Sequence, residues 1–366
     1  MSEHIAVILG TRPEIIKLAP VIRACQIHDQ PCTIIHTGQH YSENLDSVFF
    51  EQLGLPDPDY NLEVGSASHG EQTGTILIRT ERVLDEISPD AVLVQGDTNS
   101  VLAGAIAASK MDVRLGHVEA GLRSYDREMP EELNRIIADH VADTLFAPTE
   151  RSKENLRKEG IPESRITVTG NTVVDALYRN RQIAQTKSTV LRELDLVDQP
   201  FFLLTLHRAE NVDDEETFRS LLTGASWAAR EQNVQVIYPI HPRARKRLSE
   251  FEIDLPDPIR LVEPVEYLDF LKLQTEARLV LTDSGGVQEE ACVLGTPCVT
   301  LRDSTERPET VTVGANRLTG HDPVEIVRCV NQMVQKKGEW ENPFGDGNAG
   351  ERILQTLAPQ VEEVHP

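Results

Sequence analysis

The sequence lacks any apolar stretch long enough to cross a membrane. No run approaches the ~20 apolar residues that a bilayer-spanning helix needs. Residues 1–4 lead straight into an apolar strand pattern, without the basic flank and long apolar region of a signal peptide. We therefore expect a soluble, cytoplasmic protein with no membrane as a partner.

Paired cysteines are also absent. The chain has 5 cysteines, and none of them forms a C-x-x-C pair. Most lie within apolar strand or helix patterns, so we expect reduced, buried thiols and no metal site. A disulfide is the weaker alternative, because a chain of 366 residues can bury a core without one. The cysteines are Cys25, Cys32, Cys292, Cys298 and Cys329.

Lysine is scarce and acidic residues dominate. Only 9 of the 36 basic residues are Lys, against 59 acidic residues, and the net charge is −23. Such a charge repels nucleic acid and anionic lipid, so neither is expected as a partner. An anionic ligand would need Arg and His concentrated locally at its site. The Lys-poor, acidic composition also fits a salt-rich, halophilic cytoplasm, where screening weakens self-repulsion.

Two common nucleotide-binding fingerprints are missing. The chain contains neither the G-x-G-x-x-G dinucleotide motif nor a P-loop with its Lys. NAD and ATP are therefore not supported, and no cofactor is expected.

The chain does contain a repeated alternation of strand and helix patterns. Apolar strand patterns at Ile5–Leu9 and Ala91–Gln95 alternate with helical patterns such as Pro13–Ala24, and the alternation starts again at Phe201–Leu206. The predicted fold class is α/β, with two Rossmann-like, doubly wound parallel-sheet domains facing a cleft. The expected division is an N-terminal domain at 1–178, a linker at 179–200, a nucleotide-binding domain at 201–349, and a C-terminal helix at 350–366 that packs back on the first domain.

Ligands bind at the carboxyl ends of parallel strands, so functional residues are expected where the predicted strands end. Arg12 stands in Gly10-Thr11-Arg12-Pro13-Glu14 after the first predicted strand, with Lys17 one turn further on. Both side chains could face an anion, or the segment could be an ordinary strand-to-helix turn.

A second motif, Asp283-Ser284-Gly285-Gly286, follows an apolar strand and opens a helix. Ser284 and the two Gly amides predict an anion site at the helix N-terminus, suited to a nucleotide diphosphate. Glu290, further along the helix, could accept from both ribose hydroxyls. The alternative is a simple N-cap, but a double Gly weakens a helix start.

Carboxylates follow predicted strands in the first half. Asp97 and Glu119 come directly after apolar strands, and Glu131 stands at the start of a helical pattern. Carboxylates beside a low-dielectric cleft can serve as general acids or bases. Glu131 alone could equally be an acidic residue of a helix's first turn.

Two histidines stand at strand ends of the second half, His207 in Leu206-His207-Arg208 and His241 in Ile240-His241-Pro242. Their equivalent positions favour phosphate contact or proton transfer. Arg307 lies in a polar loop that either reaches a diphosphate or is solvated.

These motifs together resemble the non-hydrolysing UDP-N-acetylglucosamine 2-epimerases, and the resemblance runs end to end in the family's order. The matching segments are GTRPE, TGQH (Thr37–His40), QGDT, HVEAGLR, PEELNR (Pro130–Arg135), APTE (Ala147–Glu150), TGNTVVD (Thr169–Asp175), HRAEN, HP, DSGGVQEE and ERPE. The resemblance implies the two-domain GT-B-type architecture, a homodimer, and reversible conversion of UDP-GlcNAc to UDP-ManNAc without a cofactor. UDP is eliminated and re-added through 2-acetamidoglucal.

The resemblance also implies roles for single residues. Asp97, Glu119, Glu131 and His207 would carry the acid–base chemistry. Arg12, His207, Ser284, Gly285, Gly286 and Arg307 would hold the diphosphate, Glu290 the ribose, and Lys17, Asn171 and His241 would line the site. Some relatives are activated at a second site near TGQH, which Gln39 and His40 match. Glu71 stands where those relatives would carry a basic residue, which argues against such activation here.

Four other functions remain open. The protein could epimerise a modified UDP-sugar such as a 2,3-diacetamido uronic acid, or it could release free ManNAc by admitting water. A glycosyltransferase could share the fold, but it needs one base rather than three carboxylates. A nucleotide-sugar sensor would keep Ser284 and Glu290 and would show no turnover.

Overall fold

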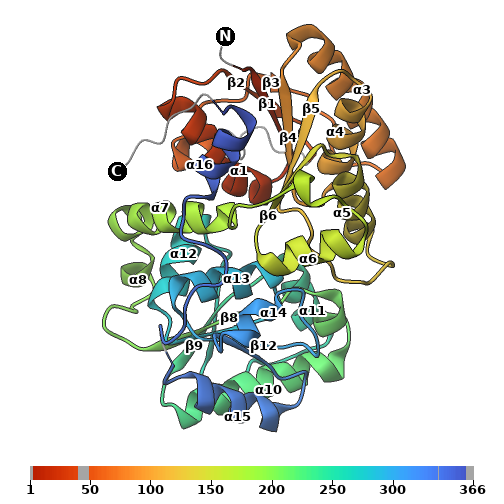
Figure 1. Ribbon diagram of the computed structural model, residues 1–366. Helices are drawn as coiled ribbons and strands as arrows, with labels where there is room; N and C mark the ends of the chain where they lie inside the picture. Colours follow the sequence, from red (N-terminus) through yellow and green to blue (C-terminus); the bar gives the residue numbers. More distant parts are fainter. Residues whose placement is uncertain (1–2, 40–48, 337, 360–366) are drawn as a thin grey trace. The chain divides into compact units, whose positions relative to one another are not determined.

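The computed structural model describes residues 3–39, 49–336 and 338–359, and it divides the chain into two compact units. Unit 1 consists of Met1–Ala176 and Phe344–Pro366, and unit 2 of Leu177–Pro343. Each unit contains its own parallel sheet (Figure 1). The prediction of two doubly wound α/β domains is confirmed.

The sheet of unit 1 has the order β3-β2-β1-β4-β5-β6-β7 among its described strands, and all pairs are parallel. β1 and β4 are buried along their whole length because helices cover both faces of the sheet. The strands are β1 (Ile5–Leu9), β2 (Cys32–His36), β3 (Tyr60–Asn61), β4 (Ala91–Gln95), β5 (Arg114–Val118), β6 (Thr144–Ala147) and β7 (Ile166–Val168).

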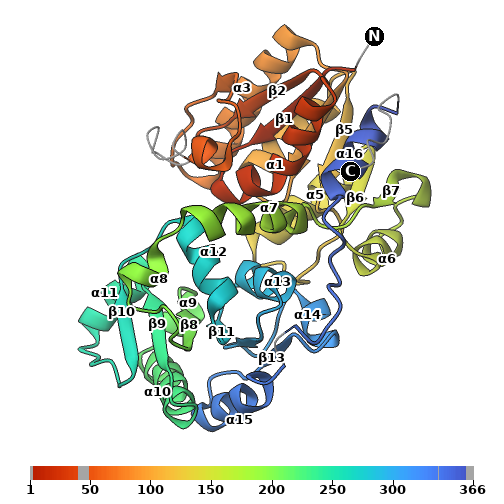
Figure 2. The same cartoon turned by 90° about the vertical axis from the view of Figure 1, so that its left-hand side faces the viewer.

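Helices α1 (Arg12–Ile27) and α16 (Ala349–Leu357) pack together on one face of this sheet (Figures 1 and 2). Gly350 permits the close approach, since a Cβ there would meet the Pro20 carbonyl carbon at 2.8 Å. The other described helices of this unit are α3 (His69–Ile87), α4 (Asn99–Ser109), α5 (Pro130–Val141), α6 (Glu150–Lys158), the 3₁₀ turn η1 (Glu163–Arg165) and the first part of α7 (Thr172–Lys187). Of these, α3 and α5 flank α4.

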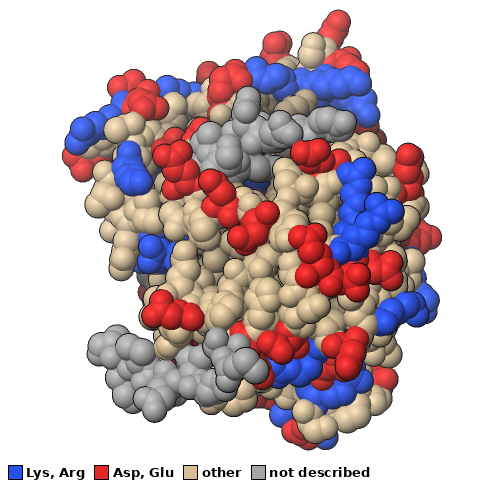
Figure 3. Space-filling model, turned by 90° about the horizontal axis from the view of Figure 1, so that it is seen from above, with Lys and Arg blue, Asp and Glu red and all other residues tan. Residues whose placement is uncertain are grey.

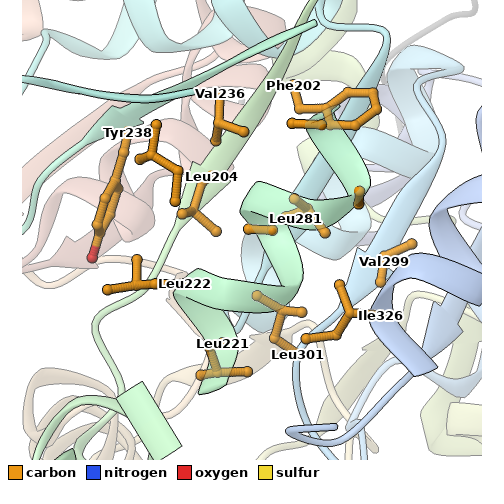
Figure 4. Packing of buried hydrophobic residues seen from close by; sticks show 14 of the residues in the cluster. Phe202, Leu204, Leu221, Leu222, Val236, Tyr238, Leu281, Val299, Leu301 and Ile326 are labelled. Atoms are coloured by element: carbon orange, nitrogen blue, oxygen red, sulfur yellow. The ribbon is translucent and has the colours of Figure 1, made fainter. Parts of the chain in front are cut away.

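The sheet of unit 2 has the order β10-β9-β8-β11-β12-β13, again parallel. Alternate residues of β8 point to opposite faces. Phe202 and Leu204 face a core built with α10 and α15, whereas Phe201 and Leu203 face α8, α12 and α13. Figure 4 shows the first of these cores, in which Phe202 and Leu204 lie among Leu221, Leu281 and Ile326. The strands are β8 (Phe201–Thr205), β9 (Gln235–Pro239), β10 (Ile259–Val262), β11 (Leu279–Thr282), β12 (Cys298–Thr300) and β13 (Asn316–Leu318).

The described helices of unit 2 that come after Phe201 follow the alternation that the sequence predicts, and α8 precedes them. Together, these helices are α8 (Val190–Glu193), α9 (Ala209–Val212), α10 (Glu215–Glu231), α11 (Pro242–Glu250), α12 (Tyr267–Glu276), α13 (Gly285–Leu294), α14 (Pro308–Thr312) and α15 (Pro323–Met333).

The boundary between the units differs from the expected linker. The division falls inside α7, and the stretch 179–200 contains the second half of α7 together with α8. The helical pattern of α7 is hidden in the sequence because buried Asn180 and the small Ala184 interrupt its apolar face.

The face of the molecule seen from above Figure 1 carries both signs of charge. Figure 3 shows Asp and Glu interspersed with Lys and Arg on this face rather than gathered into one basic area. A distributed acidic surface agrees with the net charge of −23.

Candidate active site

Glu119 is the most firmly held of the predicted carboxylates. It follows β5, is only 6% exposed, and has a left-handed backbone with φ of 68°. Lys17 Nζ on α1 lies 2.7 and 2.6 Å from its two carboxylate oxygens, and Gln95 at the end of β4 donates to Oε2. These two contacts with the Lys17 ammonium hold the Glu119 carboxylate in one orientation.

Asp97 follows the neighbouring strand β4, whose Gln95 pairs with Val118 of β5. An ion pair joins its Oδ2 to Arg135 on α5, and Asn134 Nδ2 donates to its backbone carbonyl at 2.9 Å. The structure therefore brings the predicted QGDT and PEELNR motifs together. Asp97 and Glu119 stand at the ends of two hydrogen-bonded strands.

Two adjacent glutamates at the start of α5 have different surroundings. Glu132 is buried and accepts from Ser124 N and Tyr125 N at 2.9 Å, and it also lies 3.0 Å from Arg135. Glu131 is exposed, and its side chain forms no hydrogen bond or ion pair with a residue that the structure describes. Glu132 thus anchors the preceding loop, while Glu131 presents an accessible carboxylate.

The first motif places a cation beside a buried acid. Arg12 is exposed, and its guanidinium lies 5.7 Å above the Phe49 ring. Glu14 is buried and accepts from Gly10 N at 2.8 Å and from Thr98 Oγ1 at 2.6 Å. Burial outweighs these hydrogen bonds and raises the pKa of Glu14 to about 7. Sequence reasoning did not single out Glu14, because its partner Thr98 is distant in the chain.

Three further predicted positions lie at loops and helix starts. Asn171 is buried, and its Oδ1 accepts from Val173 N at 3.1 Å at the start of α7. Gln39 accepts from Ser100 Oγ at 2.8 Å through its side chain. Glu71 stands in the first turn of α3. The prediction on His40 lies outside the described residues.

In unit 2, Asp283 organises the predicted histidine motif. It is fully buried, and its Oδ2 accepts from the backbone N–H groups of His207 and Arg208 at 2.9 and 3.0 Å. His207 Nδ1 lies 2.9 Å from Oδ1, and the rings of His207 and His241 are 5.7 Å apart. Burial raises the pKa of Asp283, but the contacts with His207 and Arg208 outweigh it and lower the pKa. Burial and the neighbouring His207 lower the pKa of His241.

The Ser-Gly-Gly motif begins helix α13 as predicted. Ser284 is the N-cap residue, and its side chain makes no capping bond to a described residue. Gly286 is exposed, whereas Gly285 is buried against the carboxylate of Glu306. A helix N-terminus with an uncommitted hydroxyl and an exposed Gly suits an anion. Glu290, further along α13, accepts from Gln274 Nε2 at 2.6 Å.

Arginines surround Glu306 in the loop after β12. Arg208 and Arg302 lie 2.9 and 2.8 Å from its carboxylate oxygens, and Arg307 lies 3.2 Å from Glu289. Burial raises the pKa of Glu306, but these arginines outweigh it and lower the pKa to about 2. This cluster provides the local concentration of Arg side chains that an anionic ligand would need in so acidic a protein. The sequence alone did not assign a role to three members of this charged cluster, Arg208, Arg302 and Glu306.

The described part of the chain contains no group of three or more His, Cys, Asp or Glu side chains that could hold a metal ion. Its helices include none long and apolar enough to cross a bilayer. The chemistry that these residues support is proton transfer by fixed carboxylates in unit 1 and anion binding at a helix N-terminus in unit 2. Together with the two parallel sheets, these features are typical of α/β enzymes that bind an anionic ligand at the carboxyl ends of their strands.

Comparison with known proteins agrees with this class. Residues 23–358 match the family described as UDP-N-acetylglucosamine 2-epimerase. A UDP-N-acetylglucosamine 2-epimerase of Methanocaldococcus jannaschii is 54% identical over 96% of this chain and 98% of its own. A crystal structure of the M. jannaschii enzyme in complex with UDP-GlcNAc and UDP has a TM-score of 0.87 and covers 97% of this chain and 99% of its own. A UDP-2,3-diacetamido-2,3-dideoxy-D-glucuronate 2-epimerase of Pseudomonas aeruginosa is 41% identical over 97% of this chain and 99% of its own.

The chain belongs to the UDP-N-acetylglucosamine 2-epimerase family, and the predicted resemblance is confirmed. It is an isomerase of the epimerase class.

Proposed function

We propose that the protein interconverts UDP-N-acetylglucosamine and UDP-N-acetylmannosamine by elimination and re-addition of UDP. The observation that carries this proposal is a pair of fixed carboxylates, Glu119 held by Lys17 and Asp97 held by Arg135. Inversion at a carbon needs one group to remove a proton and another to return it on the opposite face. Two acid–base groups at the ends of adjacent strands fit that requirement.

The chemistry follows from the acidity of C2–H. This proton is not alpha to a carbonyl, so the C1–O bond breaks first and its electron pair leaves with UDP. The positive charge that develops at C1 acidifies C2–H, and a carboxylate takes the proton to give 2-acetamidoglucal. Another acid returns a proton to the other face of C2, and UDP adds again at C1.

The roles that we propose for individual residues follow this scheme. Asp97, Glu119, Glu131 and His207 transfer protons. The diphosphate is bound by Arg12, His207, Ser284, Gly285, Gly286 and Arg307, and the ribose by Glu290, while Lys17, Asn171 and His241 line the site. The exposed carboxylate of Glu131 and the uncommitted end of α13 support these assignments.

A homodimer in the cytoplasm completes the proposal. Ile78 on α3 and Leu133 and Ile137 on α5 are 49%, 39% and 40% exposed, and α3 and α5 flank the same helix α4. Partly exposed apolar side chains on these two helices fit contact with a second copy of the chain. The five cysteines are free thiols in the structure, which fits a reducing compartment.

Proton NMR of the purified protein with UDP-GlcNAc in D₂O, at low and high salt, tests the function. The expected result is deuterium at C2 together with a new UDP-ManNAc anomeric signal. Free ManNAc with UDP would instead show the hydrolysing reaction. No exchange, with UDP still bound, would contradict the proposed substrate, and UDP-2,3-diacetamido-glucuronate would then be tested next.

A further inference from the structure

A fully buried histidine lies behind the two carboxylates and has no place in the chemistry described so far. His117 stands on β5 two residues before Glu119, and none of its surface is exposed. A buried imidazole must have both of its ring nitrogens satisfied, so its partners define its protonation state.

Both partners of His117 are acceptors. Nε2 lies 2.8 Å from the carbonyl oxygen of Gly96, which has no proton to give. Nδ1 lies 2.7 Å from Asp139 Oδ1. The other oxygen of Asp139 accepts from Gly121 N at 3.2 Å and pairs with Arg123 at 2.7 Å, so this carboxylate is ionised. Both ring nitrogens therefore donate, which only an imidazolium can do.

The charges around the ring also favour a protonated imidazole. Burial lowers the pKa of His117, but the contacts with Asp139, Gly96 and Glu119 outweigh it and raise the pKa. Burial raises the pKa of Asp139, and the contacts with His117 and Arg123 outweigh it and lower the pKa. The groups facing the ring are thus Asp139 from α5 and Glu119 from the end of its own strand.

The two hydrogen bonds reach both catalytic loops. Gly96 has a φ of 85°, a left-handed conformation that favours glycine, and its carbonyl directly precedes Asp97. Fixing this carbonyl fixes the backbone that carries Asp97.

On the other side, Asp139 holds the backbone of Gly121 two residues after Glu119. We propose that His117 is a positioning residue, kept as an imidazolium, which fixes the loops of Asp97 and Glu119 for proton transfer. This inference rests on the proposed function.

Two substitutions separate the two hydrogen bonds of the ring. In His117→Gln the side-chain amide can reach the place of Nε2 and still donate to Gly96. In His117→Asn the amide takes the place of Nδ1 and can donate only to Asp139. Both variants remove the positive charge of the ring. They therefore differ only in which of the two hydrogen bonds the new amide can make.

We expect His117→Asn to lower kcat about 100-fold and His117→Gln about 10-fold or less, since small misplacements of a catalytic group cost rates of this order. UDP affinity should change less than about 3-fold in both, because the ring contacts the carboxylate loops of unit 1. The acid limb of the kcat–pH profile should move to higher pH in both variants, because the cation near Glu119 is lost. His140→Gln, at an exposed position of α5, is the matched control and should behave as the wild type.

NMR of the wild-type protein with ¹⁵N-labelled histidine decides the charge state without any variant. One ring should keep imidazolium shifts at both nitrogens from pH 6 to 9, and this signal should vanish in His117→Gln. A ring that titrates, or equal losses of kcat in the Gln and Asn variants, would overturn the inference. An inactive wild-type protein that still shows the persistent imidazolium would contradict the proposed function instead.

Discussion

The carboxylate of Glu306 lies directly against the α-carbon of Gly285, so that a Cβ added to Gly285 would meet Glu306 Oε1 at 2.2 Å. Glu306 cannot easily move away, because Arg208 and Arg302 hold it at 2.9 and 2.8 Å. The neighbouring Gly286 has open space instead, with Ser284 Oγ as its nearest contact at 4.0 Å. Gly285 therefore has a steric reason to be glycine that its neighbour Gly286 lacks.

This difference predicts opposite results for two alanine substitutions. Gly285→Ala should lower the free energy of unfolding by about 1–3 kcal/mol, because the methyl group displaces Glu306 from its arginines. Gly286→Ala should leave it unchanged or slightly raised, since Ala is favoured over Gly in a helix by about 0.5–1 kcal/mol. Urea denaturation measures both, and calorimetric titration with UDP should show weaker binding in both. Equal stability of the two variants would show that Glu306 moves without cost.

Lys17 offers a test of what the first motif does. If its partner is Glu119, as the distances of 2.7 and 2.6 Å indicate, Lys17→Met should lower kcat on the order of 100-fold and leave UDP affinity nearly unchanged. If it binds the diphosphate instead, the Kd for UDP should rise. Epimerisation followed by proton NMR and titration with UDP separate these outcomes. Lys110→Met, at the exposed end of α4, is the matched control.

Glu14 should make stability depend on pH in an unusual direction. Its folded-state pKa of about 7 lies above the ordinary value of 4.5, so the folded protein binds this proton more tightly than the unfolded chain does. The contribution to stability is therefore complete below pH 4.5 and is lost as the pH rises to 7, by about 3 kcal/mol. Glu14→Gln cannot titrate, so the unfolding free energy of the wild type minus that of the variant should fall over this window. A flat line for Glu14→Gln would refute the shifted pKa.

The residues at strand ends were predictable from the sequence, but their partners were not. Asp97, Glu119 and His207 follow apolar strands, and that pattern is local. The pairing of Lys17 with Glu119 joins residues 102 positions apart, and Thr98 with Glu14 84 positions apart. Such contacts depend on how helices pack on the sheet, which periodicity does not encode.

Helix α3 shows the same limit for secondary structure. Its buried face consists of Gln72, Ile76, Thr80, Val83 and Leu84, so two of five inward positions are polar and the apolar period is broken. The signal that could have found it is Ser68, whose side chain accepts from Glu71 N as an N-cap.

The proposed dimer makes a prediction on α5. Leu133 and Ile137 are one helical turn apart and partly exposed, so a charge at both places would be desolvated in an interface between copies. Light scattering should show the wild type at about twice 40.8 kDa and Leu133→Glu/Ile137→Glu at the monomer mass. Val324→Glu, at a residue of α15 that is 67% exposed, should leave the mass unchanged. A double variant that keeps the dimer mass would place the contact between copies on another face, and a monomeric wild type would remove the dimer from the proposal while leaving the epimerase chemistry of Asp97 and Glu119 untouched.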